Sequence, residues 1–224
     1  ATTNSDGAVT YTPAAGTALG VGTHTLHVDV AATANYTAAS KDVTIVVGKA
    51  TQTITWGTPA AITYGTALSA TQLNAATSGD GALTYTPAAG LVLGGGTQTL
   101  HVDAAETANY NAAGLDVTIL VTPATPTITW TDPAAITFGT ALGATQLAAA
   151  TTSNGALSYS PPAGTVLGAG THTLHVDAAA TANYIAVGKD VTIVVGKATP
   201  TITWADPAAI RDGTSLSATQ LEAA

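Results

Sequence analysis

A histidine followed two residues later by an aspartate occurs three times in the sequence, each time within Thr-Leu-His-Val-Asp. The pairs are His27 and Asp29, His101 and Asp103, and His175 and Asp177. Residues i and i+2 of a strand share one face, so each pair could hold a metal ion or sense pH. A metal ion would need a third ligand from another strand or chain, which the spacing does not identify. The alternative is a solvated strand face with a favourable cross-strand pair.

Other reactive side chains give weaker signals. Asp42, Asp116 and Asp190 are expected to begin the last strand of their repeats, but a calcium loop needs several acidic residues in a short span. Almost every polar residue of note is present in triplicate, whereas an active site normally brings unlike residues together at one place. The sequence therefore predicts no enzyme, no catalytic residues, no metal site and no cofactor.

Aromatic residues recur at a constant spacing of 74 residues. They are Trp56, Trp130 and Trp204, together with Tyr36, Tyr110 and Tyr184. A lone tryptophan that alternates with isoleucine along a strand is typical of core or junction packing, although an exposed ring could stack on a carbohydrate. We predict core or junction packing for these aromatic residues.

A tandem repeat positions all of these side chains. The frame of 74 residues runs through the chain without insertion or deletion, which is the signature of an array. It gives an incomplete repeat at residues 1–49 that lacks its first strands, and complete repeats at 50–123 and 124–197. Residues 198–224 are the first strands of a further repeat.

Within a repeat, polar and apolar residues alternate in short runs separated by turn residues. Residues 97–103, for example, place Leu100 and Val102 on one face. About seven such strands per repeat, without a sustained helical period, predict an all-β sandwich. We expect residues 68–73 to be one of the short strands. The joints between repeats are short and two carry proline, so the array is expected to form a rod.

Three stretches of the second repeat carry a family resemblance. Residues 53–75 contain Thr-Ile-Thr-Trp followed by Pro-Ala-Ala-Ile-Thr-Tyr-Gly-Thr-Ala-Leu, residues 85–90 read Tyr-Thr-Pro-Ala-Ala-Gly, and residues 108–113 read Ala-Asn-Tyr-Asn-Ala-Ala. This pattern resembles the bacterial immunoglobulin-like repeats of large surface and secreted proteins. The resemblance covers the whole chain and implies tandem immunoglobulin-like β-sandwiches that serve as stalk, spacer, adhesin or fibre modules. The last copy departs from the pattern at Arg211 and Asp212.

The composition narrows the possible partners. Charged residues make up 8% of the chain, which is about a third of the usual share, and the net charge is −8. This charge argues against nucleic acid and against anionic membrane surfaces. No apolar run reaches the roughly 18 residues of a membrane span, so no membrane insertion is expected. A neutral surface favours contacts with copies of the chain, including lateral contacts, or with cell-envelope components.

The partial repeats at the two ends suggest two arrangements. The chain is either a window on a longer polypeptide, or a subunit whose final strands complete the first half-domain of a neighbour head-to-tail. The residues predicted to make that contact are Ile202, Trp204, Ile210, Leu216 and Leu221. We therefore expect a structural extracellular filament or cell-surface fibre. The alternatives are a stalk or spacer of a large cell-surface adhesin, and a glycan-binding module.

Overall fold

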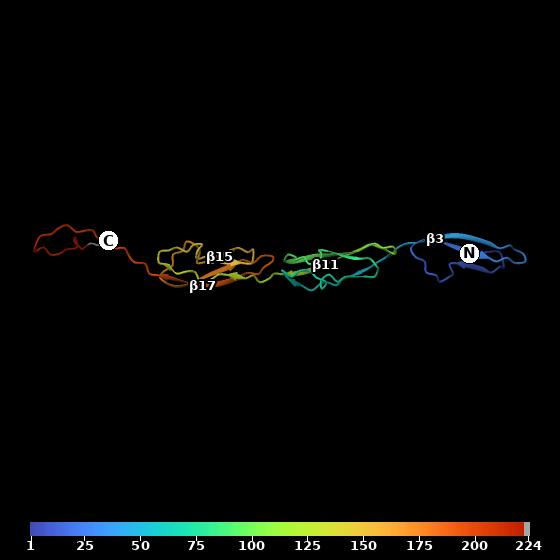
Figure 1. Cartoon of the computed structure of the whole chain (residues 1–224), viewed down its shortest axis with the longest axis horizontal. Coiled ribbons are helices and arrows are strands. Elements are labelled where there is room, and N and C mark those ends of the chain that lie inside the picture. Colours follow the sequence, from blue (N-terminus) through green and yellow to red (C-terminus); the bar gives the residue numbers. More distant parts are fainter. Residues whose placement is uncertain (222–224) are drawn as a thin grey trace. The chain divides into compact units, whose positions relative to one another are not determined.

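A computed structural model of the chain describes residues 1–221. The chain divides into two compact units, residues 1–124 and the residues from 125 onward. The regular elements of the described residues are β-strands (Figure 1), which confirms the predicted all-β fold. The described residues include no helix that could span a membrane.

The second repeat is a sandwich of a larger sheet and two short strand pairs. The sheet has the order β6-β11-β9-β8, and the pairs are β5-β7 and β4-β10. The strands are β4 (Ala50–Thr51), β5 (Ile54–Thr55), β6 (Ile62–Thr63), β7 (Ala76–Thr77), β8 (Leu83–Thr86), β9 (Gly96–Ala104), β10 (Tyr110–Asn111) and β11 (Ala113–Thr122). Strand β11 runs antiparallel to β9 and parallel to β6.

The third repeat has the same plan. Its sheet has the order β13-β17-β16-β15, and β12 pairs with β14. The strands are β12 (Ile128–Thr129), β13 (Ile136–Thr137), β14 (Ala150–Thr151), β15 (Leu157–Ser160), β16 (Gly170–Ala178) and β17 (Val187–Gly196). The second repeat thus has eight strands and the third has six, against about seven expected.

The core of each complete repeat lies between two parts of the chain, which we name the opening segment and the body. The opening segments are residues 50–74 and 124–148, and the bodies are residues 75–123 and 149–197. In the third repeat, Trp130 and Leu142 of the opening segment pack with Leu174 and Ile193 of the body. Alternation along β16 and β17 buries every second side chain. Neither part can bury its apolar face without the other.

Residues 68–73 contain a turn at residues 70–72 and no strand, so the prediction of a short strand there is wrong. The amides of Gln72 and Leu73 donate to the carbonyl of Ser69. The Gln72 side-chain oxygen accepts hydrogen bonds from both the amide and the hydroxyl of Ser69. These local hydrogen bonds compete with strand pairing, and they stabilise the turn.

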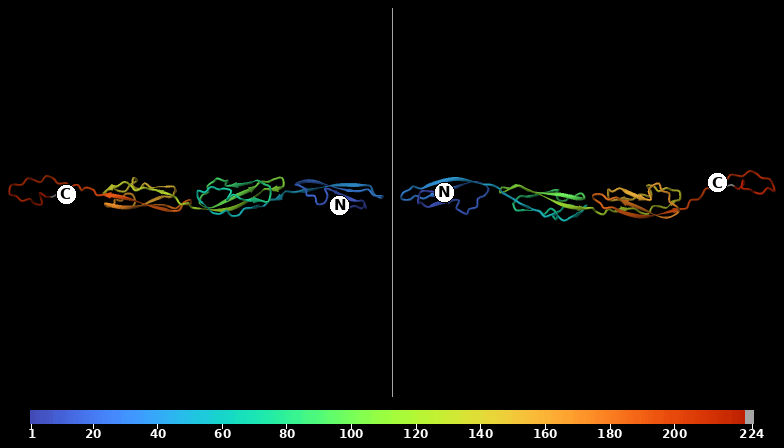
Figure 2. Two further views of the ribbon diagram at one scale, coloured as in Figure 1. Left: turned by 60° about the horizontal axis from the view of Figure 1, so that its bottom comes forward. Right: turned by 180° about the vertical axis from the view of Figure 1, so that it is seen from behind.

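The two partial repeats have only one part each. Residues 1–49 correspond to a body, which we call the first body, and form one sheet in the order β1 (Val9–Thr12), β2 (Gly22–Val30) and β3 (Ala39–Val47). The final segment, residues 198–224, corresponds to an opening segment, and residues 222–224 lie outside the described residues. Residues 198–221 carry no strand and are drawn as the red trace in Figures 1 and 2. A strand needs a partner strand to satisfy its backbone groups, and this segment has none here.

Candidate functional site

Each of the three bodies carries one histidine between two aspartates on the outer face of its long hairpin. In the first body, His27 Nδ1 lies 2.5 Å from Asp42 Oδ1, and His27 Nε2 lies 3.0 Å from Asp29 Oδ1. Strand pairing places the second aspartate, because His27 and Asp42 are directly opposite in β2 and β3. The sequence spacing predicts the pairing of His27 with Asp29, but the strand register was needed to add Asp42.

The other two bodies repeat this geometry closely. His101 lies 2.5 Å from Asp116 and 3.1 Å from Asp103, and His175 lies 2.5 Å from Asp190 and 3.1 Å from Asp177. The two ring nitrogens of each histidine face different carboxylates, so the oxygens do not converge on one point. Within residues 1–221 no group of three histidine, aspartate or glutamate side chains is arranged to hold a metal ion. The clusters are therefore suited to hold a proton on the imidazole.

The carboxylates favour the charged form of each histidine. The hydrogen bond to Asp42 raises the pKa of His27 above its ordinary value of 6.5, and the hydrogen bond to Asp29 raises it further. Asp116 and Asp190 are the main causes of the raised pKa of His101 and of His175. A raised pKa in the folded state stabilises the fold most fully below the unfolded-state pKa, and this stabilisation is lost as the pH rises through the folded-state pKa.

This linkage predicts that raising the pH lowers the stability of the third repeat, because His175 loses its proton. The urea midpoint of unfolding should fall as the pH rises from about 6 to about 9, and His175→Gln should flatten that dependence. The matched control is His172→Gln, because Gln98 occupies the equivalent position in the second repeat and makes the same contact with a loop carbonyl. Circular dichroism in urea at each pH measures the effect. An equal slope in the parent chain and in His175→Gln would contradict it.

The tryptophans of the complete repeats are core residues. Trp56 and Trp130 are buried, and their Nε1 atoms donate to the carbonyls of Gln72 and Gln146 at 3.0 and 3.1 Å. Each ring meets a body tyrosine edge-on, at a centroid distance of 5.4 Å. These two rings thus join an opening segment to a body and leave no face for a carbohydrate.

The tyrosines of the Ala-Asn-Tyr motif lie just before the last long strand of each body. Tyr110 begins β10, which pairs in parallel with the joint strand β4 through Tyr110 and Ala50. Tyr184 of the third repeat is half-buried, whereas Tyr36 of the first body is exposed.

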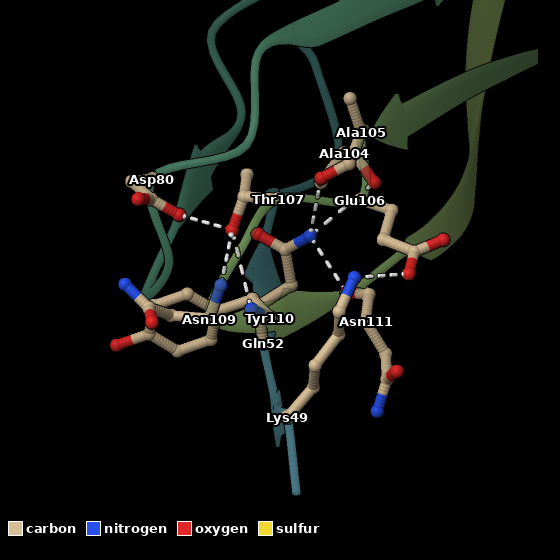
Figure 3. A network of polar contacts seen from close by, with 10 residues as sticks. All are labelled: Lys49, Gln52, Asp80, Ala104, Ala105, Glu106, Thr107, Asn109, Tyr110 and Asn111. Atoms are coloured by element: carbon tan, nitrogen blue, oxygen red, sulfur yellow. Dashed lines mark hydrogen bonds and ion pairs between the residues drawn. The ribbon is translucent and has the colours of Figure 1, made fainter. Parts of the chain in front are cut away.

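A buried glutamine organises the start of the second repeat (Figure 3). Gln52 is almost fully buried, and its amide nitrogen donates to the carbonyls of Ala105 and Asn111, both at 2.9 Å. A longer contact of 3.3 Å reaches the carbonyl of Ala104, and the Gln52 oxygen accepts from Thr77 Oγ1 at 3.1 Å. Sequence reasoning missed this residue because the other copies have proline there, so no triplet draws attention to it.

The joint before the second repeat is also tied down. Lys49 forms an ion pair with Glu106, and the Ala50 amide donates to the carbonyl of Asn109 at 2.8 Å. Both contacts hold the joint against the loop that precedes β10, as Figure 3 shows for Lys49 and Glu106. The joint is therefore an ordered part of the unit formed by residues 1–124.

The two partial repeats expose apolar residues that the complete repeats bury. In the final segment, Trp204 is 56% exposed and Leu216 is 63% exposed, whereas the equivalent Trp130 and Leu142 are 5% and 2% exposed. The other predicted contact residues of this segment, Ile202, Ile210 and Leu221, are exposed as well. In the first body, Tyr11, Val43 and Ile45 are exposed. Large exposed apolar patches mark interaction surfaces.

The open face of the first body is hollowed. One hollow is lined by Val9, Val28 and Val30, and a neighbouring one by Tyr11, Leu26 and Val43. These positions match body residues of the third repeat that pack with its opening segment. The first body therefore presents apolar hollows lined by the positions that pack against an opening segment in the third repeat.

A scan of protein-family models and a search of curated proteins found no match. Among solved structures, the chain is similar to Drosophila N-cadherin EC1-4, with 13% identity and a TM-score of 0.29, over 77% of this chain and 57% of that one. It is also similar to Drosophila N-cadherin EC1-3, with 13% identity and a TM-score of 0.26, over 79% and 78% of the two chains. The chain thus spans less than two thirds of the EC1-4 structure. These TM-scores support no inference about function.

Proposed function

We propose that the chain is a structural and adhesive component of an extracellular filament or cell-surface fibre. In this fibre, the final segment of one copy completes the first body of the next copy by adding the missing strands. The observation that carries the proposal is that apolar residues are exposed on both the final segment and the first body. The apolar residues exposed in the final segment and in the first body occupy the positions whose equivalents pack together in the core of the third repeat.

The geometry of such a contact favours a line of molecules. The final segment and the first body are different surfaces, so the contact is head-to-tail and a rod of the expected kind grows at both ends. Strand addition supplies main-chain hydrogen bonds as well as apolar burial. The small charged fraction of 8% also favours neutral lateral contacts between fibres or with the cell envelope.

The chemistry of the described residues fits a structural role better than a catalytic one. The histidine clusters are the most reactive groups, and each repeat carries the same one with both ring nitrogens engaged. No cofactor, nucleic acid or membrane insertion forms part of the proposal.

A stalk or spacer of a large cell-surface adhesin is the second candidate. The ordered joint at Lys49 and Gln52 favours it, because such joints stiffen a run of domains within one polypeptide. There the missing strands would come from the same chain. Measuring the mass of the native protein separates the two, because a discrete subunit has a mass near 21.9 kDa and a stalk is far larger. A glycan-binding module is the third candidate, with Trp204 as its exposed ring.

Sedimentation velocity over a range of concentrations tests the proposed strand addition. The parent chain should form linear oligomers, and removal of residues 198–224 should abolish them. Fluorescence gives a second readout, because Trp204 is exposed in the single chain and its emission should shift to shorter wavelength on association. Oligomers that persist after the deletion would overturn strand addition, as would a parent chain that stays monomeric at high concentration.

A further inference from the structure

The two complete repeats join their parts by different contacts, and a first difference lies at the start of the opening segment. The second repeat has Gln52 there and Gly79 in its body, whereas the third repeat has Pro126 and Ser153. A Cβ atom added at Gly79 would lie 2.4 Å from Gln52 Oε1 and 2.9 Å from Gln52 Cβ. A serine at this body position would therefore crowd the buried glutamine, whereas Ser153 coexists with Pro126 in the third repeat.

A second difference lies in the polar contacts between opening segment and body. In the third repeat, the Thr192 amide donates to Asp132 Oδ1 at 2.8 Å, and Lys189 Nζ donates to the carbonyl of Ile128 at 3.4 Å. The second repeat has Thr58 and Leu115 in place of Asp132 and Lys189, and Leu115 packs against the core instead. The two complete repeats thus follow two rules. Under the first rule, glutamine and threonine in the opening segment occur with glycine and leucine in the body. Under the second rule, proline and aspartate in the opening segment occur with serine and lysine in the body.

The first body follows the second of these rules. Ser5 occupies the position of Ser153, and Lys41 occupies the position of Lys189. The loop geometry also agrees, because Ser5 Oγ accepts from the Gly7 amide at 3.0 Å and Ser153 Oγ accepts from the Gly155 amide at 2.9 Å. The final segment follows the same rule, with Pro200 and Asp206 at the positions of Pro126 and Asp132.

We infer that the first body selects its opening segment, accepting residues 198–221 of a second copy and rejecting a segment of the kind found at 50–74. Ser5 excludes the buried glutamine by steric conflict. Asp206 accepts from the Thr44 amide, and Lys41 donates to the Ile202 carbonyl, as the equivalent residues do in the third repeat. These contacts fix the register in which β3 receives the new strand. This inference rests on the proposed end-to-end association and adds its specificity.

We therefore expect the final segment of a second copy not to exchange into the complete second repeat. An opening segment that fitted any body could exchange with residues 50–74 and open that repeat. Pro200 cannot supply the hydrogen bonds that Gln52 makes to the carbonyls of Ala105 and Asn111, so exchange would lose both of them. Discrimination of this kind works by penalising the wrong partner as well as by favouring the right one.

Variants of the full chain test the selection. Pro200→Gln together with Asp206→Thr gives the final segment the residues of the second repeat, and should weaken association by roughly tenfold or more. Adding Ser5→Gly should recover at least part of that loss, because it opens the space that the glutamine needs. Ala205→Gly is the matched control, since Gly57 is found at the equivalent position of the second repeat and contacts nothing there. Sedimentation velocity measures each dissociation constant.

The outcomes separate this inference from the proposed function. If deletion of residues 198–224 abolishes association while the double variant associates as the parent does, the selection is overturned and strand addition stands. If Ser5→Gly fails to improve association of the double variant, the steric part of the selection is overturned. If the deletion leaves association unchanged, the proposed function itself fails. Circular dichroism checks that the folded repeats are unaltered, since positions 200 and 206 are exposed.

Discussion

Replacement of Leu174 by alanine is expected to lower the free energy of unfolding of the third repeat by about 2–5 kcal/mol. Leu174 lies in the middle of β16 and is fully buried. It belongs to the cluster that joins the opening segment to the body, so its removal leaves a cavity between the two parts. Rigid β-pairing on both sides of β16 limits how far the site can collapse around that cavity.

The matched control is Leu26→Ala, which makes the same change at the equivalent position of the first body. Leu26 is only half-buried in the single chain, so the loss should be clearly smaller in dilute solution. Urea unfolding followed by tryptophan fluorescence measures the loss for Leu174→Ala, in a Trp56→Phe background that leaves Trp130 as the buried reporter of the third repeat. Circular dichroism follows the first body. Equal losses for the two variants in dilute solution would show that the first body is already closed.

Gly79→Ser is expected to destabilise the second repeat by about 1–3 kcal/mol, because the added side chain enters space that Gln52 fills. The buried amide cannot move away without giving up its hydrogen bonds to the carbonyls of Ala105 and Asn111. In the third repeat the same serine is tolerated opposite Pro126. The combined variant Gln52→Pro and Gly79→Ser should therefore be more stable than the sum of the single changes predicts.

A double-mutant cycle measures this coupling. We expect a coupling energy of about 1 kcal/mol or more in favour of the combined variant, from urea unfolding of the four chains. Gly57→Ala serves as the control glycine, because no atom lies near the position of its added Cβ. Strict additivity of the two changes would show that serine and glutamine do not compete for space, and it would remove the steric basis of the selection inferred for the first body.

Features that recur with the repeat were open to prediction from the sequence. The alternation in residues 97–103 located β9, and the spacing of the tryptophans pointed to the core positions of Trp56 and Trp130. Features that depend on strand register or on a single copy were not. Asp42 lies 15 residues from His27 and joins it only because β2 and β3 pair in one register.

Local hydrogen bonding and unique residues account for the other differences. The turn at residues 68–73 carries a strand-like composition, but the Gln72 side chain closes it onto Ser69. Gln52 has no counterpart in the other repeats, so its polar network could be found only from the structure.

The parallel pairing of β6 with β11 has a consequence for a chain under tension. Ile62 and Thr63 are paired with Val121 and Thr122, and the Tyr64 amide donates to the Thr122 carbonyl at 2.8 Å. Tension applied to the two ends of the repeat pulls β6 towards its amino end and β11 towards its carboxyl end. The strands are therefore loaded in shear, and their hydrogen bonds must break together instead of unzipping one after another. In the third repeat β13 and β17 pair in the same parallel way, so each complete repeat resists stretching through the pairing of its last strand.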